Sequence, residues 1–347
     1  IFKMTRHGFH INFQKGYMVQ NMQQQGRLRN KVVVVTGASS GAGKAIAMAF
    51  AREGAKLVLA ARREAALAET VADCEAIGTE AIGVVTDVTS ARDVEALAEK
   101  AAEWGGGIDV WVNNAGVLAA GDFEVTPVQV HDQVIRTNLM GYIHGAHAAM
   151  PFFKQQHRGI LINNISVGGW FPTPYAVGYS ASKYGLRGFS EALRGELYSW
   201  PHIYICDLYP AFLDTPGIQH AANYTGCALK PAPPVYNPAR VGKAAVELAL
   251  QPQHSKIVGS MTLFLKWANE LLPGVSRRIT AGMINSYFKA APSIEATSGN
   301  LFTPTPFGSS IYGGWNSTAD AEDRQKTFGQ VLLVAGLALG LYLLKKR

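Results

Sequence analysis

Hydrophobic residues follow two alternating spacings along most of the chain. Short runs of β-branched and aliphatic residues, such as KVVVVTG at 31–37, are typical of strands buried on both faces of a parallel sheet. Other segments carry apolar residues three or four positions apart, as in AGKAIAMAFAREGA at 42–55, and this spacing predicts helices.

Strands predicted in this way lie near residues 31–37, 56–62, 80–87, 108–116, 159–166 and 202–210, and helices near 42–54, 63–78, 90–104, 127–155 and 178–200. Strands that alternate with helices form βαβ units. We therefore expect an α/β fold, with one doubly wound parallel sheet covered by helices on both faces.

The alternation ends at Pro210, and the remaining chain divides by composition. Residues 211–237 are rich in proline and are predicted to be mobile, whereas 238–250 has helical spacing. We expect a catalytic domain over 30–260, a helical extension over 261–291 with a break at Pro273, and a Gly/Pro/Ser/Thr-rich linker over 292–327. Residues 1–29 form a polar, basic leader that we expect to be poorly ordered.

The C-terminal residues 328–347 contain a nearly uninterrupted apolar run that ends in KKR. A helix of this length spans somewhat less than the ~30 Å hydrocarbon core of a bilayer. We predict a membrane anchor, with the catalytic domain on the cytosolic side and GxxxG spacing at Gly336 and Gly340. The alternative is a helix buried in the core or in an oligomer contact, which would leave the protein cytoplasmic.

Charge and cysteine content narrow the range of functions. The formal net charge is +7, without a block of like charges, so a nucleic-acid partner is not expected. This excess of positive charge suits a phosphorylated cofactor or an anionic membrane surface. The three cysteines form no CxxC pair, and the leader lacks the apolar run of a secretory signal, which together indicate a reduced intracellular setting and no metal site.

A glycine-rich turn, TGASSGAG at Thr36–Gly43, lies between the first predicted strand and the first predicted helix. Glycines allow close approach of the backbone to a ligand, and the N–H groups of a helix N-terminus bind phosphate. The spacing is TGxxxGxG and differs from the commoner GxGxxG. The segment is either a dinucleotide-binding turn or a tight turn alone, and its position after a buried strand favours the first.

The end of the second strand, LAARRE, bears on the choice of nicotinamide cofactor. An acidic residue there binds the ribose 2′-hydroxyl, whereas an arginine accommodates a 2′-phosphate. Ala61 takes the place of the acid, and Arg62 and Arg63 follow. NADP(H) is therefore the predicted cofactor, with NAD(H) as the alternative if the arginines only begin a solvated helix.

Tyr179 and Lys183 are four positions apart in GYSASKYG, so they are neighbours on one helix face. A lysine next to a tyrosine lowers the phenol pKa from about 10. A phenol tuned in this way exchanges a proton with an alkoxide or alcohol. Ser166 ends the fifth strand and is placed to bond a substrate oxygen, and Asn138 is an amide within a predicted helix, which is a local conflict typical of functional sites.

TGASSGAG, Asp87, NNAG at 113–116, Asn138, Ser166 and YSASK occur in an order and spacing that resemble the short-chain dehydrogenase/reductase family, in its short-form branch. The resemblance covers about residues 30–260. It implies a Rossmann fold and hydride transfer between a nicotinamide and a carbonyl or alcohol carbon. The complete set of residues predicted to bind the cofactor is Gly37, Ser39, Ser40, Gly41, Gly43, Arg62, Arg63, Asp87, Asn114, Ala115, Gly116, Tyr179, Lys183, Pro210 and Thr215.

The resemblance also implies a role for each catalytic residue. Tyr179 would be the general acid/base, and Lys183 would lower its pKa and bind the nicotinamide ribose. Ser166 would position the substrate oxygen, and Asn138 would support a water molecule in a proton relay. Asp87 is expected to contact the adenine or to cap the next turn. The sequence departs from the family at Ile165, where many members have a second serine, and at Ala211, where the family has glycine.

The predicted pocket wall comprises residues 168–175 and the proline-rich segment after Pro210. Trp170, Phe171 and Tyr175 suggest a lipophilic carbonyl or alcohol substrate if they line the pocket, although core or dimer contacts explain them equally well. A homodimer or homotetramer is expected. Two other functions remain open. One is a catalytically idle nucleotide-binding scaffold, against which Tyr179 and Lys183 argue, and the other is an epimerase or dehydratase of the extended branch, against which the glycine spacing argues.

Overall fold

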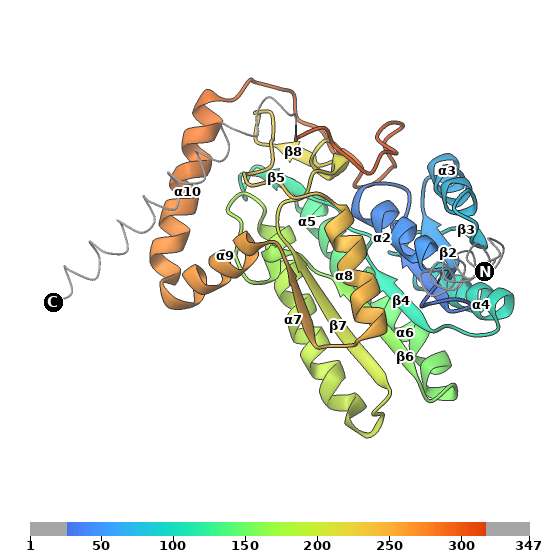
Figure 1. Cartoon of the computed structure of the whole chain (residues 1–347). Helices are drawn as coiled ribbons and strands as arrows, with labels where there is room; N and C mark the ends of the chain where they lie inside the picture. Colours follow the sequence, from blue (N-terminus) through green and yellow to red (C-terminus); the bar gives the residue numbers. More distant parts are fainter. Residues whose placement is uncertain (1–25, 317–347) are drawn as a thin grey trace, which may run out of the picture.

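The computed structural model describes residues 26–316 and contains one seven-stranded sheet (Figure 1). Its strands are β1 (Val32–Thr36), β2 (Lys56–Ala61), β3 (Ala81–Val85), β4 (Val110–Asn113), β6 (Gly159–Asn164), β7 (Ile203–Pro210) and β9 (Ser255–Val258). Their order is β3-β2-β1-β4-β6-β7-β9, and all neighbouring pairs are parallel. This confirms the doubly wound α/β fold predicted from the alternating pattern.

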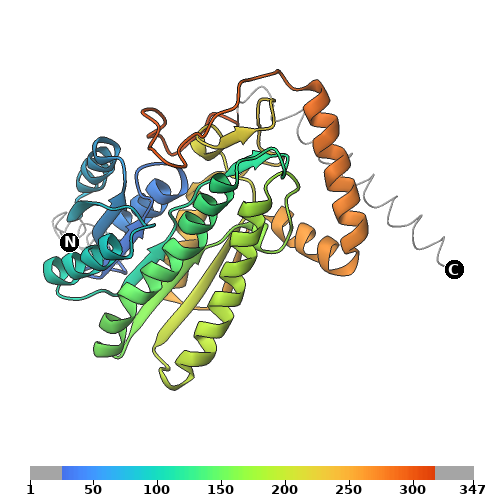
Figure 2. The ribbon, with the colours of Figure 1, turned by 180° about the vertical axis from the view of Figure 1, so that it is seen from behind.

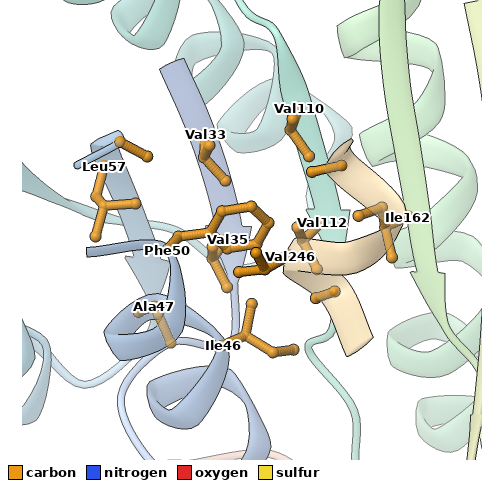
Figure 3. Packing of buried hydrophobic residues seen from close by; sticks show 14 of the residues in the cluster. Val33, Val35, Ile46, Ala47, Phe50, Leu57, Val110, Val112, Ile162 and Val246 are labelled. Atoms are coloured by element: carbon orange, nitrogen blue, oxygen red, sulfur yellow. The ribbon is translucent and has the colours of Figure 1, made fainter. Parts of the chain in front are cut away.

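The central strand β1 is buried on both faces because helices cover each side of the sheet. Successive side chains of a strand point to opposite faces. Val33 and Val35 therefore pack against Ile46, Ala47 and Phe50 of the helix α2 (Gly41–Arg52), as Figure 3 shows. The helices α3 (Glu64–Glu75) and α8 (Ala239–Leu250) contribute to the same cluster.

The other face of β1 presents Val32 and Val34 to a second hydrophobic cluster. The helices α4 (Ala91–Gly105), α6 (Gly141–Gln155) and α7 (Val177–Glu196) form this layer (Figure 2). The helix α5 (Val128–Ile135) joins α6 through a π-helix at Arg136–Met140, so the single helix predicted over 127–155 contains an irregular turn. Short 3₁₀ turns lie at Val167–Gly169, Leu197–Ser199 and Pro216–Ile218.

The region after β7 differs most from the sequence prediction. Residues 211–237 were expected to be mobile, but they contain the strand β8 (Ala222–Tyr224), which pairs in parallel with β5 (Ala119–Gly121). The edge strand β9 was not predicted either, because only Val258 of its residues is buried and the segment gives no buried-strand signal. The strand β9 extends the main sheet beyond β7, and β8 forms a separate two-stranded sheet with β5.

Two helices, α9 (Ser260–Leu271) and α10 (Pro273–Ala290), extend from the sheet with the predicted break at Pro273 (Figure 1). The chain then returns over β8 and β5 towards α2 and α3, visible in red in Figure 1. The predicted linker therefore does not lead away from the catalytic domain in its described part, residues 292–316. At the other end, Leu28 of the predicted leader is buried, and Arg27 forms an ion pair with Glu53.

The prediction of a membrane-associated protein is corrected by the structure. Between residues 26 and 316, no helix is both long and apolar enough to cross a bilayer. The run at 328–347, on which the prediction depended, lies outside the described residues, as does the leader from 1 to 25.

Candidate active site

A cleft of about 410 Å³ lies at the carboxyl ends of the parallel strands, where ligands of open α/β sheets bind. It reaches from Arg62 and Arg63 after β2 to Tyr179 and Lys183 on α7. The structure brings the predicted site residues together around this space. Those that line it are Gly37, Ser39, Ser40, Gly41, Gly43, Arg62, Arg63, Asp87, Asn114, Ala115, Gly116, Ser166, Tyr179, Lys183, Pro210 and Thr215.

The glycine-rich turn approaches the loop after β4 so closely that side chains are excluded. Gly37 has φ +66°, and a Cβ atom there would lie 2.7 Å from the Cα atom of Ala115. A Cβ atom at Gly43 would lie 2.1 Å from the Gly37 carbonyl oxygen. The side-chain amide of Asn114 donates to the carbonyl oxygens of Thr36 and Gly37 and so fixes the two loops together.

The turn leads into α2, and the N-cap residue Ser40 makes no side-chain hydrogen bond to the helix. The Gly41 N–H donates to the Ser310 carbonyl oxygen, and an N-terminus without a side-chain cap leaves the next backbone N–H groups for an anion. This donor set, together with the arginines at the end of β2, fits a phosphorylated dinucleotide.

Tyr179 and Lys183 occupy adjacent turns of α7 and both face the cleft. The Lys183 Nζ atom lies 5.6 Å from the centre of the Tyr179 ring and 5.0 Å from that of Tyr142. Lys183 is 4% exposed, and burial lowers the pKa of its ammonium to about 7. Burial raises the pKa of the Tyr179 phenol, and a hydrogen bond with Ser166 acts in the opposite direction.

Ser166 has a backbone conformation that is rare for a residue with a side chain. Its φ of +118° lies in the region that normally favours glycine, and such strain is often found at functional sites. Its Oγ atom accepts a hydrogen bond of 3.2 Å from the Gly168 N–H. A Cβ atom at Gly168 would lie 2.9 Å from the Tyr179 ring, so this turn must pass close to the tyrosine.

Asn138 lies in the π-helix and is fully buried, outside the lining of the cleft. Its side chain accepts a hydrogen bond from the Val117 N–H at 2.8 Å and donates to the Val117 carbonyl at 2.9 Å. It also donates to the Ser182 hydroxyl. Asn138 therefore fixes the loop that follows β4 to the helix that carries Tyr179, and its support of a water molecule stays a prediction.

Asp87 both lines the cleft and caps a turn. Its Oδ1 atom accepts hydrogen bonds from the backbone N–H and the hydroxyl of Thr89, at 2.9 and 2.8 Å. The structure therefore supports the capping alternative and leaves adenine contact as a prediction.

The aromatic residues expected at the substrate pocket lie elsewhere. Trp170 packs between the cationic groups of Arg187 and Lys266, and Tyr175 contacts Phe288 on α10. From the stretch 168–175, only Gly168 and Thr173 line the cleft. The segment after Pro210, the other predicted part of the pocket wall, does line the cleft through Phe212, Leu213 and Ile218. The apolar residues Val117 and Leu118 also line it and were not singled out in the sequence.

Arg62 and Arg63 line the far end of the cleft, and no carboxylate pairs with them within the described residues. Their partners are backbone carbonyl oxygens. Arg62 donates to Asn300, Leu301 and Phe302, and Arg63 donates to Thr305 and Phe307 at 2.8 and 2.6 Å. These partners were missed in the sequence because every residue has a carbonyl group.

The fold and the cleft are those of an α/β protein with a binding site at the carboxyl edge of a parallel sheet, and comparisons with known proteins specify the family. Residues 31–224 match the family described as short chain dehydrogenase. The uncharacterised oxidoreductase YxnA of Bacillus subtilis is 33% identical over 73% of this chain and 72% of its own. The 11-beta-hydroxysteroid dehydrogenase A of Sesamum indicum is 36% identical over 53% of each chain. This chain belongs to the short-chain dehydrogenase/reductase family.

Solved structures agree with this assignment. A short-chain dehydrogenase/reductase from Burkholderia phymatum in complex with NAD superimposes with a TM-score of 0.62, at 27% identity, over 79% of this chain and 99% of that one. An alcohol dehydrogenase from Thermococcus sibiricus complexed with 5-hydroxy-NADP gives a TM-score of 0.58, at 28% identity, over 66% and 95%. Relatives therefore bind cofactors with and without a 2′-phosphate.

Proposed function

We propose that the protein interconverts a ketone or aldehyde and the corresponding alcohol, with Tyr179 as general acid/base and NADP(H) as the preferred cofactor. The observation that carries this proposal is the convergence of Ser166, Tyr179 and Lys183 on one cleft that continues to Arg62 and Arg63. A scaffold without catalytic activity would have no need to hold a phenol and a buried lysine together at a strained serine. The glycine spacing continues to disfavour an epimerase or dehydratase.

The proposed chemistry assigns one task to each side chain. The bound cofactor supplies the hydride in reduction and accepts it in oxidation. Tyr179 donates its phenolic proton to the carbonyl oxygen as that oxygen becomes an alkoxide, and its raised pKa keeps the phenol protonated for this step. In the reverse direction, the phenolate removes the proton of the alcohol. The Ser166 hydroxyl hydrogen-bonds the same oxygen.

Lys183 is proposed to hold the nicotinamide ribose and to act on Tyr179 through its charge. Its Nζ atom is buried beside the tyrosine ring, and its pKa of about 7 allows both protonation states near neutral pH. A positive charge at this distance favours the phenolate. The lowering of the Tyr179 pKa by Lys183 stays a prediction.

The preference for NADP(H) is supported by the charge at the ribose end of the cleft. Two adjacent arginines that lack a carboxylate partner among the described residues are suited to a phosphate dianion. Other cofactor contacts are proposed for the residues that line the cleft, including Asn114–Gly116, Pro210 and Thr215. NAD(H) remains the alternative cofactor.

The proposed substrate is a lipophilic carbonyl compound or alcohol, since the cleft is lined by Leu118, Phe212, Leu213 and Ile218. Members of this family commonly form oligomers, and a homodimer or homotetramer stays a prediction. Incubation with NADPH and a panel of aldehydes and ketones, followed by absorbance at the nicotinamide band, tests the function. Absence of turnover for every compound, with cofactor binding intact, would favour the idle scaffold.

A further inference from the structure

Residues 297–316, which we call the strap, cross the mouth of the cleft. The strap begins at Thr297, which exchanges backbone hydrogen bonds with Asn223 of β8. Leu301 is fully buried in a cluster with Val117 and Val130. Figures 1 and 2 both show the chain passing from α10 over β8 and β5 towards α2.

The far end of the strap is fixed to the loop after β7. The Asp214 carboxylate accepts hydrogen bonds from the N–H groups of Gly313 and Trp315, at 3.1 and 2.9 Å. The indole of Trp315 donates to the Thr215 carbonyl. Between its two fixed ends, the strap contributes the Ser310 carbonyl to the N–H of Gly41, the first residue of α2. The strap thus connects both walls of the cleft.

The middle of the strap is part of the cleft wall. Asn300, Pro304 and Thr305 line the same space as Arg62 and Arg63. The Oδ1 atom of Asn300 and the Nε2 atom of His220 are buried there without a hydrogen-bond partner in the described part of the chain. Buried polar atoms without a partner are rare, and two of them beside one cleft point to a polar ligand at this end.

We propose that the strap is a cofactor-specificity element, which holds Arg62 and Arg63 in position for a 2′-phosphate and closes the adenosine end of the site. This proposal rests on the NADP(H) preference proposed above and adds the residues that produce it. Selectivity at the end of β2 then depends on a segment about 240 positions away in the chain.

The strap carbonyls use only some of the N–H donors of Arg62 and Arg63, so the two arginines can still bind a 2′-phosphate while the strap holds them. The strap carbonyls accept from the Nη1 and Nη2 atoms of Arg62 and from Nη1 of Arg63. A guanidinium group has five N–H donors, so the Nε–H groups and one or more Nη–H groups of these arginines remain for a ligand. The carbonyl groups are uncharged, so both guanidinium groups keep their positive charge for the phosphate. The hydrogen bonds also restrict the rotamers of both arginines before the cofactor binds, which lowers the entropy cost of binding.

The test compares two adenosine fragments that differ in the 2′-phosphate, 2′,5′-ADP and 5′-AMP, by calorimetric titration of the full chain. Leu301→Ala should loosen the carbonyls at 300–302 without changing either arginine. We expect the preference of the wild type for 2′,5′-ADP to fall by about tenfold in this variant, and 5′-AMP affinity to change by less than about threefold. Leu301→Met should restore most of the preference.

Leu97→Ala is the matched control, because Leu97 is a fully buried leucine of α4 outside the lining of the cleft. It should lower the melting temperature and leave the ratio of the two affinities unchanged. A wild type without a preference for 2′,5′-ADP would contradict the proposed NADP(H) function itself. A preference that is retained or increased in Leu301→Ala would overturn the strap proposal alone, since the strap would then be a passive cover or a competitor.

Discussion

At one end of the cleft, Tyr179 and Lys183 stand on a helix of 20 residues and are held by contacts from neighbouring strands and helices. At the other end, Arg62 and Arg63 follow a buried strand, but their partners come from an irregular segment far away in the sequence. The side chains of Tyr179 and Lys183 are largely buried at the catalytic end, so desolvation shifts their pKa values. The ribose end is polar, and its geometry depends on how the strap is fixed.

Substitutions at the two ends should therefore have different consequences. If the proposed function is correct, a substitution at the catalytic end should change proton transfer or the cost of burying a charge. A substitution at the ribose end should change the affinity for one cofactor relative to the other. Four variants separate these effects, and the size of the expected change decreases from the loss of turnover at Tyr179 to a small loss of affinity at Phe307.

Tyr179→Phe should reduce turnover by about 10²–10⁴-fold, the usual contribution of a general acid/base. The variant removes the hydroxyl and keeps the ring that packs beside Gly168 and Lys183. Initial rates with NADPH and a reactive ketone measure the loss, and titration with 2′,5′-ADP should show binding close to that of the wild type. Tyr184→Phe, on the exposed side of the same helix, is the control and should retain activity. Activity within tenfold of the wild type would remove Tyr179 from the mechanism.

Lys183→Met should make stability less dependent on pH. The pKa of Lys183 is about 7 in the folded protein, whereas an unperturbed lysine has a pKa of 10.5. Between these values the unfolded state binds more protons, so this group makes the wild type more stable as pH rises, by about 1.4 kcal/mol per unit. Below pH 7 the folded protein carries the full cost of the buried charge, and the methionine variant should have its greatest advantage there.

Denaturant unfolding of both proteins at pH 6, 7, 8 and 9 measures this difference. The advantage of Lys183→Met should be greatest at pH 6, should begin to decrease near pH 7 and should fall steadily from pH 7 to 9. Lys243→Met is the control, since Lys243 is 80% exposed and should give a profile parallel to that of the wild type. A parallel profile for Lys183→Met as well would mean that the lysine keeps its proton throughout this range.

Much of the catalytic end was predictable from sequence because its signals are local and depend on residue type. The apolar runs predicted six of the seven strands of the main sheet, and the i, i+4 spacing placed Tyr179 beside Lys183. The π-helix at Asn138 was not predictable in detail, although an amide inside a helix did mark the position. Its bonds to Val117 are tertiary contacts that no periodicity reveals.

The ribose end was predictable only in part. The arginines were evident, but the strap that contacts them was interpreted as a linker because it is rich in glycine, proline and serine. Those residues suit a chain that follows a surface without regular structure. The strap binds the arginines through backbone carbonyls, which carry no signature in the sequence. The prediction that Trp170 and Tyr175 line the substrate pocket was wrong for a similar reason. Their positions depend on tertiary contacts with Arg187 and Phe288, which the sequence does not reveal.

Arg62→Ala tests the ribose end directly and should weaken NADPH by about 10–100-fold, because a hydrogen bond to a charged group contributes about 1.5–3 kcal/mol. NADH should weaken by less than about threefold. Fluorescence titration with both cofactors measures the two constants. Arg52→Ala, at the opposite end of α2, is the matched control and should affect neither. Equal losses for NADPH and NADH would show that Arg62 is only a surface charge.

Phe307→Ala should have the smallest effect of the four variants. The Phe307 ring meets the His220 ring edge-on at 5.4 Å, although Phe307 is 54% exposed. Aromatic pairs contribute about 0.5–1.5 kcal/mol beyond area burial, and this exposure places the pair towards the lower end. Loss of the contact should loosen the carbonyl that accepts from Arg63 and weaken 2′,5′-ADP by about two- to fivefold. Turnover at saturating NADPH should stay unchanged, since the variant leaves the catalytic end intact.

Phe302→Ala provides the matched control for this small effect. Phe302 lies on the same strap and is 49% exposed, but its ring makes no aromatic contact within residues 26–316. Removing it should leave the affinity for 2′,5′-ADP within twofold of the wild type. If both phenylalanine variants weaken binding equally, the strap responds to any loss of apolar surface. If only Phe307→Ala weakens binding, the contact between Phe307 and His220 fixes the strap carbonyl that accepts from Arg63. The geometry of the ribose end would then depend on this specific contact.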